Sequence, residues 1–309
     1  MAEPAVLARA AASGLALESE STVAGRLDSG RLLVRRFAAH RLALFSLVVL
    51  AAVFLLAFVG ARLWRYGYTD LTDDLSQPPS LKHPMGTDGI GHDLFAQVLR
   101  GTQKSLQVGL VVAAVSTAVG AIAGAFAGYH RGWLDATVMR LTDVTLSVPG
   151  IAVLAVLATS TQDTTGNWLA VALILSSLSW MGIARVVRSL MLSLREQPFV
   201  DAARAAGATG RRIVFRHLLP HASGAIIVKA SLTVGAAVLA ETALSYLGLG
   251  ISPPDTSLGR LVESGQHAAS TRPWLFYFPG LVILVIVLCV NFIGDGLRDA
   301  VDPKARRRG

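Results

Sequence analysis

The stretch VGLVVAAVSTAVGAIAGAFAGY, residues 108–129, decides the fold class. It is apolar throughout and contains no charged side chain. A bilayer core about 30 Å thick needs roughly 20 helical residues at 1.5 Å each. The stretch therefore predicts a helix that crosses a membrane.

Five other runs share this character. Three contain no charge, one contains only Asp143, and one contains Lys229 and Glu241. They predict an all-α, polytopic membrane protein with six transmembrane helices. The predicted spans are Leu42–Gly60, Val108–Tyr129, Leu141–Ser160, Trp168–Ala184, Ala222–Gly250 and Trp274–Gly294.

The composition agrees with lipid as the solvent. The chain has 309 residues, of which 53% are hydrophobic and only 16% are charged, too few charges for a soluble domain of this size. Its net charge of +8 indicates basic flanks facing anionic lipid rather than a nucleic-acid partner. The single cysteine, Cys289, excludes an intramolecular disulfide.

The positions of Lys and Arg set the orientation. With the N-terminus inside, the inner segments and Lys229 hold 21 of the 28 basic residues, so both termini are expected in the cytoplasm. The exceptions lie in the first outer loop: Arg62, Arg65, Lys82, Arg100 and Lys104. The predicted parts are a tail at 1–41, disordered over its first 30 residues, an outer loop at 61–107, a core at 108–294 containing the cytoplasmic loop 185–222, and a tail at 295–309.

Two spans carry internal features. Ser116, Gly120, Gly124 and Gly128 recur every four residues, so they share one helix face on which another helix can pack closely. The spacing does not say which helix that is. Pro149 interrupts the third span and can bend it, either to shape a pathway or to fit neighbouring helices.

The segment FVDAARAAGATGRRIVFRHLLPH, residues 199–221, interrupts the apolar body. Pro198 suits the first position of a short helix and Asp201 suits its first turn, while Gly207 can cap its end. Thr209 can cap a second helix, from Gly210 toward Leu219, which Pro220 would end. A thin, alanine-covered helix suits a cleft on another protein, and a solvated basic loop is the alternative. Composition leaves both open.

The spacing within this segment resembles the conserved loop of ABC importer permeases. That pattern is Glu-Ala-Ala, three residues, Gly, nine residues, an apolar residue, one more, then Leu-Pro. Here the matching positions are Asp201-Ala202-Ala203, Gly207, His217 and Leu219-Pro220; Asp201 and His217 depart from the pattern. The resemblance implies a coupling helix in which Asp201, Ala202, Ala203 and Gly207 contact a nucleotide-binding subunit.

Other motifs resemble peptide and nickel importer permeases, and in particular the second permease subunit of dipeptide and oligopeptide importers. They appear in the same order along residues 83–303, with His92 as a departure. These motifs are His83-Pro84-Met85-Gly86-Thr87-Asp88 with Gly91 and Asp93, Ala243–Gly250 with Pro253-Pro254, Pro273-Trp274, Phe278-Pro279-Gly280, and Asn291–Asp299 through Asp302-Pro303.

The resemblance implies a type I importer permease in a bacterial inner membrane. Its partners would be a homologous permease in a heterodimer, one or two ABC ATPase subunits, an extracytoplasmic substrate-binding protein and membrane lipid. The substrate would be a short peptide, or alternatively nickel, haem or glutathione. ATP-Mg would bind the ATPase subunits, and no cofactor would bind this chain.

Other sites are disfavoured. His83, Asp88, His92 and Asp93 have the chemistry of metal ligands, but Gly-rich spacing favours a structural turn followed by a short amphipathic helix, 94–99, and we expect no metal. The stretch GTDGIG (86–91) lacks a Walker A ending, and none occurs elsewhere. No hydrolase motif appears, so we expect a transport subunit that is not an enzyme.

Two ionisable groups remain within a span. Lys229 lies near the cytoplasmic end and can extend to the interface. Glu241 lies about six residues from the outer end, where it either lines a pathway or holds the bundle together by hydrogen bonds. A stand-alone ion-coupled carrier or channel is the rival class, and it predicts inverted repeats and more buried charges than this chain has.

Overall fold

The computed structural model describes residues 34–160 and 167–301. This part of the chain is helical and contains no named strand, although two isolated bridges occur in the loop that precedes Leu94. The predicted tails, apart from residues 34–41 and 295–301, and nearly all of the outer connection 161–167 lie outside the described residues.

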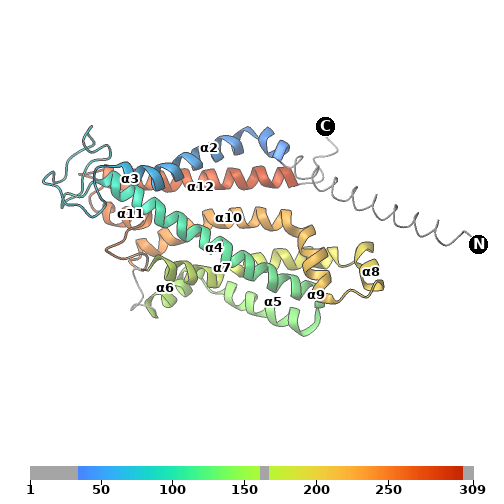
Figure 1. Ribbon diagram of the computed structural model, residues 1–309. Helices are drawn as coiled ribbons and strands as arrows, with labels where there is room; N and C mark the ends of the chain where they lie inside the picture. The colour runs from blue at the N-terminus through green and yellow to red at the C-terminus, as the bar shows by residue number, and fades with distance from the viewer. Residues whose placement is uncertain (1–33, 161–166, 302–309) are drawn as a thin grey trace, which may run out of the picture.

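The helices form an elongated bundle (Figure 1). Five continuous helical segments of the described chain are long and apolar enough to cross a membrane, and the bent pair Gly132–Ser147 and Gly150–Thr159 makes a sixth when it is counted as one span. This confirms the predicted class of multi-pass membrane protein. The elements are α2 (Arg41–Leu55), η1 (Leu56–Gly60), α3 (Ala61–Leu63), α4 (Leu94–His130), α5 (Gly132–Ser147), α6 (Gly150–Ser160), α7 (Trp168–Leu194), α8 (Pro198–Ala205), α9 (Gly210–Ile213), η3 (Val214–Leu218), α10 (Leu219–Tyr246), α11 (Leu258–Gln266) and α12 (Trp274–Val301).

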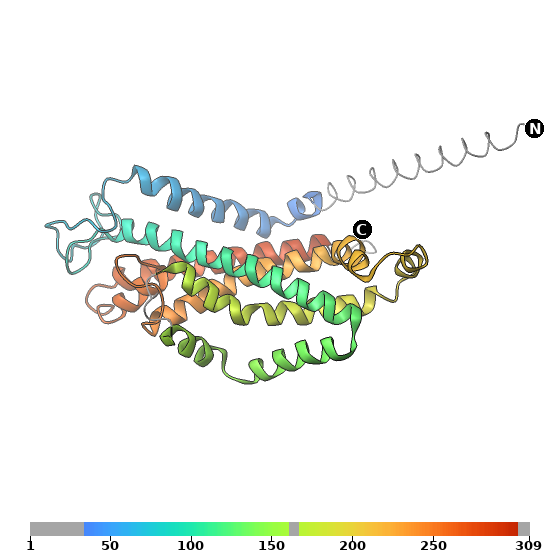
Figure 2. The same ribbon diagram turned by 60° about the horizontal axis from the view of Figure 1, so that its bottom comes forward.

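The third predicted span, 141–160, is not one straight helix. α5 and α6 meet at an angle of 90° (Figure 2). Val148, the residue before Pro149, is extended, with φ −92° and ψ 140°. Proline disfavours the helical conformation in the residue that precedes it, and at Val148 this produces the break before Pro149. The predicted bend is confirmed, and α5 begins nine residues before the predicted span.

Three helices are longer than the spans predicted within them. α4 absorbs the expected 94–99 helix and continues without interruption to His130, α7 extends past Ala184 to Leu194, and α12 takes in 295–301 of the predicted tail. On α4 and α7, charges just beyond the predicted ends are paired with distant carboxylates. Lys104 on α4, for example, lies 2.8 Å from Asp255.

The prediction that Pro220 ends a helix is wrong. Residues 210–246 form one continuous helical segment, and Pro220 lies in the first turn of α10. A five-residue π turn, η3, precedes it, and the Leu219 N–H donates to the carbonyl of Val214. A π turn changes the register of the backbone hydrogen bonds, which lets the helix continue through a residue that has no N–H.

The glycine face of α4 packs against α7. A Cβ added to Gly120 would lie 2.6 Å from the carbonyl oxygen of Trp180, and one added to Gly128 would lie 2.7 Å from that of Arg188. No side chain fits at these distances, so glycine permits the two backbones to touch. The close packing expected from the four-residue spacing is confirmed, with α7 as the partner.

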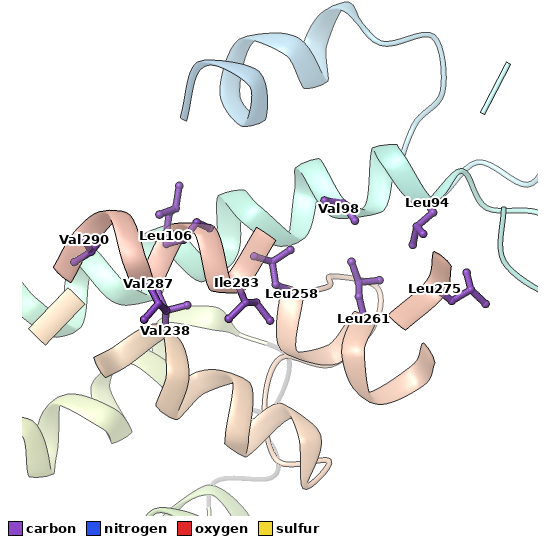
Figure 3. Packing of buried hydrophobic residues seen from close by; sticks show 11 residues of the cluster. Leu94, Val98, Leu106, Val238, Leu258, Leu261, Leu275, Ile283, Val287 and Val290 are labelled. Atoms are coloured by element: carbon purple, nitrogen blue, oxygen red, sulfur yellow. The ribbon is translucent and has the colours of Figure 1, made fainter. Parts of the chain in front are cut away.

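The outer half of the bundle has its own apolar core. α11, which the sequence did not predict, lies against α4 and α12, and Figure 3 shows the side chains gathered at this junction. The buried cluster consists of Leu94, Val98, Leu106, Val238, Leu258, Leu261, Leu275, Ile283, Ile286, Val287 and Val290. This core fixes the outer ends of three long helices relative to one another.

The start of α2 and the end of α12 lie at the same end of the bundle as α8 (Figure 1). His40 Nε2 and Asp299 Oδ2 are 3.6 Å apart, which joins the two ends directly. This placement agrees with an even number of membrane crossings. Basic-residue counting assigns this end to the cytoplasm.

Candidate functional site

α8 forms as the sequence predicts. Pro198 occupies its first turn, and Asp201 lies close to its positive end. Gly207 has φ +78°, and the backbone N–H groups of Gly207 and Ala208 donate to the carbonyls of Arg204 and Ala203. This is the Schellman arrangement, in which glycine supplies the left-handed residue after the helix. Thr209 then caps α9 by accepting a hydrogen bond from the Arg212 N–H at 3.4 Å.

One residue anchors α8 to the bundle. Val200 is fully buried, and it belongs to an apolar cluster that joins α8 to α4, α7, α9, η3 and α10. The buried members are Ala125, Ile183, Val187, Met191, Val200, Ile213, Val214, Leu218 and Ala222. Beside it, the Phe199 ring stacks on His221 at 4.7 Å between centroids. Apolar contacts therefore connect α8 to α7 and α10.

The opposite face of α8 is open. Asp201, Ala202, Ala205, Ala206 and Gly207 are exposed, and no atom lies within 4 Å of the position that a Cβ on Gly207 would occupy. Asp201 accepts a hydrogen bond from Arg204 at 3.0 Å, an exposed pair of little energetic value. This face thus has small side chains, one accessible carboxylate and no intramolecular cover.

Arginines connect α8 and the segment before it to the end of α4. The Arg204 guanidinium lies 5.7 Å from the centroid of the Tyr129 ring, and Arg195 Nη1 donates to the Tyr129 carbonyl at 2.6 Å. Gly210 also lies at this ring, since its added Cβ would be 3.0 Å from Tyr129 Cε1. These contacts attach α8 and its flanking segments to the C-terminal ends of α4 and α7.

The remaining residues of the loop pattern lie in the π turn and the start of α10. Leu219 is half-buried at the edge of the α8 cluster, and Pro220 is exposed. His217 is half-buried, and its carbonyl accepts a hydrogen bond from His221 Nδ1 at 2.6 Å. The apolar role expected at His217 falls to its neighbour Leu218, which is fully buried.

Glu241 lies near the other end of α10, about 33 Å from Leu219 along the helix axis at 1.5 Å per residue. It is fully buried. The Ser105 hydroxyl donates to Glu241 Oε2 at 3.2 Å, and the Ser245 hydroxyl donates to Oε1 at 2.6 Å. Ser105 Oγ also accepts the Leu258 N–H at 3.3 Å, and Ser245 lies 3.3 Å from Ser257. We call Glu241, Ser105, Ser245 and Ser257 the outer hub.

A charged cluster supports the same region. Asp255 accepts hydrogen bonds from Arg100 Nε at 2.8 Å and Nη2 at 3.1 Å, and Lys104 Nζ lies 2.8 Å away. Partial burial raises the pKa of Asp255, but the hydrogen bonds from Arg100 and Lys104 outweigh it, so its pKa lies below the usual value. The ammonium of Lys104 also lies 5.3 Å from the Trp168 ring. α4, α7 and the loop before α11 are joined here.

The four potential metal ligands of the outer loop are arranged in two separate pairs. His83 Nδ1 is 2.7 Å from Asp93 Oδ2, whereas His92 Nδ1 is 2.8 Å from Asp88 Oδ2. Asp93 also accepts the Ala96 N–H and the Trp64 indole N–H, so it caps α4 and holds the loop. In the described part of the chain, no three His, Cys, Asp or Glu side chains group to hold a metal ion.

Pro149 lies at the break between α5 and α6, away from both α8 and the outer hub. α5 is joined to α7 by ion pairs that the sequence did not predict. Arg188 binds Asp135 with two hydrogen bonds of 2.5 and 2.6 Å, and Arg185 Nη2 lies 2.5 Å from Asp143. These ion pairs therefore attach α5, on one side of the bend, to α7.

Sequence reasoning identified α8 and Glu241 but missed the groups that hold them. Ser105 and Ser257 lie 136 and 16 residues from Glu241, and a lone serine in an apolar helix gives no signal of such pairing. Asp255 follows Pro253-Pro254, and nothing in that motif indicates that Arg100 is its partner. Only Val200 carried a local signal, since it is a large apolar side chain beside the alanines of α8.

Comparisons with known proteins agree with this arrangement. Residues 120–307 match the family model of the binding-protein-dependent transport system inner membrane component, and residues 30–79 match the N-terminal transmembrane domain of oligopeptide transport permease C. The chain is similar to the solved structure of the MetNI methionine ABC transporter in inward-facing conformations. That match has a TM-score of 0.56 at 22% identity and covers 68% of this chain and 98% of that one, so it supports the fold.

Curated relatives are closer in sequence. The oligopeptide transport system permease protein OppC of Mycobacterium tuberculosis is 44% identical over 281 residues, 90% of this chain and 96% of the relative. OppC of Escherichia coli is 41% identical over 88% of this chain and 90% of its own. The dipeptide transport system permease protein DppC of Alkalihalophilus pseudofirmus is 35% identical over 86% and 87%.

The bundle and its projecting helix define a multi-pass permease of the inner membrane. The chain belongs to the family of inner membrane components of binding-protein-dependent transport systems, and it is a permease subunit of an ABC importer.

Proposed function

We propose that this permease subunit forms half of a pathway that imports short peptides, and that α8 docks into a partner ATPase. The observation that carries the docking is the open face of α8 opposite its buried anchor, Val200. The proposed substrate rests on relatives named for oligopeptide and dipeptide transport. The other half of the pathway is a homologous permease, which makes the membrane unit a heterodimer.

The proposed mechanism is alternating access. One or two nucleotide-binding subunits bind and hydrolyse ATP-Mg, and their movement displaces α8. Because Val200 shares one apolar cluster with α7 and α10, the displacement rotates these helices together. An extracytoplasmic binding protein delivers the substrate. This chain's role is mechanical, and we assign ATP hydrolysis to the partners.

The docking is tested by filling the open face. Ala202→Trp adds bulk where we place the ATPase, while Ala39→Trp adds the same bulk to another exposed alanine at the same end of the bundle. We expect Ala202→Trp to reduce ATPase co-purification and ATP-dependent peptide uptake by at least about tenfold, the equivalent of one lost contact of 1.4 kcal/mol. Ala39→Trp should do neither. Normal assembly and uptake with Ala202→Trp would refute the docking.

Substitutions at Gly207 distinguish a role in docking from a role in the backbone turn. Its φ of +78° suits glycine and tolerates asparagine, but strains a β-branched residue. If the ATPase needs an empty surface at this position, Gly207→Asn and Gly207→Val both lose the ATPase. If only the turn matters, Gly207→Asn retains it. Retention by both variants would remove Gly207 from the docking site.

The substrate and the rival class need separate measurements. The ligand carried by the co-purifying binding protein distinguishes a peptide from nickel, haem or glutathione. Uptake that needs neither ATP nor an ATPase would favour an ion-coupled carrier or channel. The outer hub has both Glu241 oxygens occupied by serine hydroxyls, which favours bundle stabilisation over pathway lining for this carboxyl group.

A further inference from the structure

A groove of about 480 Å³ lies where α7, α10 and α12 meet. Its walls are mainly aliphatic and include Val186, Val228, Leu232 and Val301, and Lys229 and Arg298 contribute two cations. Neither the α8 docking face nor the outer hub includes any of these residues. The groove therefore combines an apolar surface with a concentrated positive charge, and the proposed function gives it no role.

The two cations have no acidic partner within the described chain. Arg185 and Arg188 on α7 pair with Asp143 and Asp135, so the neighbouring basic side chains are neutralised. Of the carboxylates nearest to Arg298 on α12, Asp299 lies next to His40 and the exposed Asp295 forms no ion pair. The charge of the groove is thus left for an external anion.

The groove lies in the cytoplasmic half of the bundle. Arg298 is three residues from Val301, the end of α12, and this end lies on the side of α8 (Figure 1). Lys229 follows the first residue of α10 by ten positions, about 15 Å along the helix. Its flexible stem can carry the ammonium toward the headgroups. Both cations can therefore reach one anion at the inner membrane surface.

We propose that this groove binds an anionic phospholipid of the inner leaflet. The Arg298 fork and the Lys229 ammonium hold the headgroup phosphate, since guanidinium matches phosphate geometry and ammonium adds a point charge. An acyl chain covers Val186, Val228 and Leu232. Basic pockets between helices on the cytoplasmic side are suited to such headgroups.

The apolar walls favour a lipid over free phosphate. Inorganic phosphate would satisfy the two cations but would leave the aliphatic walls uncovered. A phospholipid covers both, and each buried CH₂ contributes about 0.8 kcal/mol. A bound lipid would also contact three helices at once, two of which, α7 and α10, carry the anchor of α8.

The test measures lipid retained by the full-length chain after purification in mild detergent, by native mass spectrometry. We expect the wild type to retain phosphatidylglycerol and Lys229→Gln/Arg298→Gln to retain roughly thirtyfold less, since each cation contributes about 1 kcal/mol toward an anionic headgroup. Arg211→Gln/Arg212→Gln removes the same charge from exposed positions on α9 and should retain the lipid. Equal loss in both double variants would show general attraction and overturn the site.

A second variant covers the case in which the double variant does not accumulate. Val228→Trp fills the groove and leaves both cations, so it should also lose the lipid. In thermal unfolding, vesicles of phosphatidylglycerol should stabilise the wild type, whereas inorganic phosphate or phosphatidylcholine should not. Equal stabilisation by phosphate would identify a free anion as the ligand. Cross-linking of the partner permease from Val228 in the assembled importer would show a protein interface and overturn the proposal.

Discussion

The two ends of α10 are held in opposite ways. At the outer end, Glu241 is fixed by directional hydrogen bonds to Ser105 and Ser245 in a fully buried site. At the inner end, α8 is held chiefly by Val200 in an apolar cluster. Apolar contact has no preferred direction, whereas a buried hydrogen-bond network is lost abruptly when its geometry changes. The inner end is therefore built to shift and the outer end to hold.

The strongest way to break this comparison is to remove the outer hub. Glu241→Ala leaves two buried hydroxyls without their acceptor and creates a cavity, and we expect a loss of stability on the order of 3 kcal/mol. Glu241→Gln keeps an acceptor and the shape, so it should lose about 1 kcal/mol. The unfolding midpoint in detergent measures both. If both variants unfold at the same midpoint as the wild type, the outer hub does not stabilise the fold.

The inner end should respond locally. Val200→Ala removes two methyl groups from a fully buried site, at a cost of about 2 kcal/mol. We expect faster hydrogen exchange in residues 198–209, with a smaller change in the global unfolding midpoint. Val144→Ala, at an exposed position on α5, is the matched control and should change neither. A global loss equal to that of Glu241→Ala would contradict the contrast between the ends.

The smallest expected effect concerns pH at the outer end. Because the pKa of Asp255 is lowered in the folded state, its contribution to stability is present above about pH 4, the unfolded value. It is lost as the pH falls through the lower folded pKa. The unfolding midpoint of the wild type should therefore fall more steeply than that of Asp255→Asn in this acid range. Parallel pH curves would refute the contribution of Asp255.

Local chemistry was readable from the sequence. The turn at Gly207, the cap at Thr209 and the bend at Pro149 each depend on the conformational limits of one or two residues. The membrane-spanning segments were also predictable, because length and polarity decide which segments enter lipid. The glycine face of α4 was predictable as a packing surface because Gly120, Gly124 and Gly128 recur every four residues and so share one side of the helix.

Long-range pairing was not readable. Arg100 and Lys104 appeared to end a span, yet Asp255, about 150 residues away, permits the helix to continue past them. Pro220 was expected to end a helix, but the π turn before it changes the hydrogen-bond register. The first error arose because the partner of Arg100 and Lys104 is distant in the sequence. The second arose because the residue types around Pro220 do not indicate a π turn.

The π turn at Val214–Leu218 also sets an angle. An α-helix advances about 100° per residue, and a π turn accommodates roughly one additional residue without lengthening the helix by a full step. The side of the α9–α10 segment on which α8 lies therefore depends on this one additional residue. Deleting Phe215, the exposed second residue of the turn, would restore a regular helix and redirect α8 by about a quarter of a turn. The direction in which the proposed docking helix α8 points therefore depends on the number of residues in this turn.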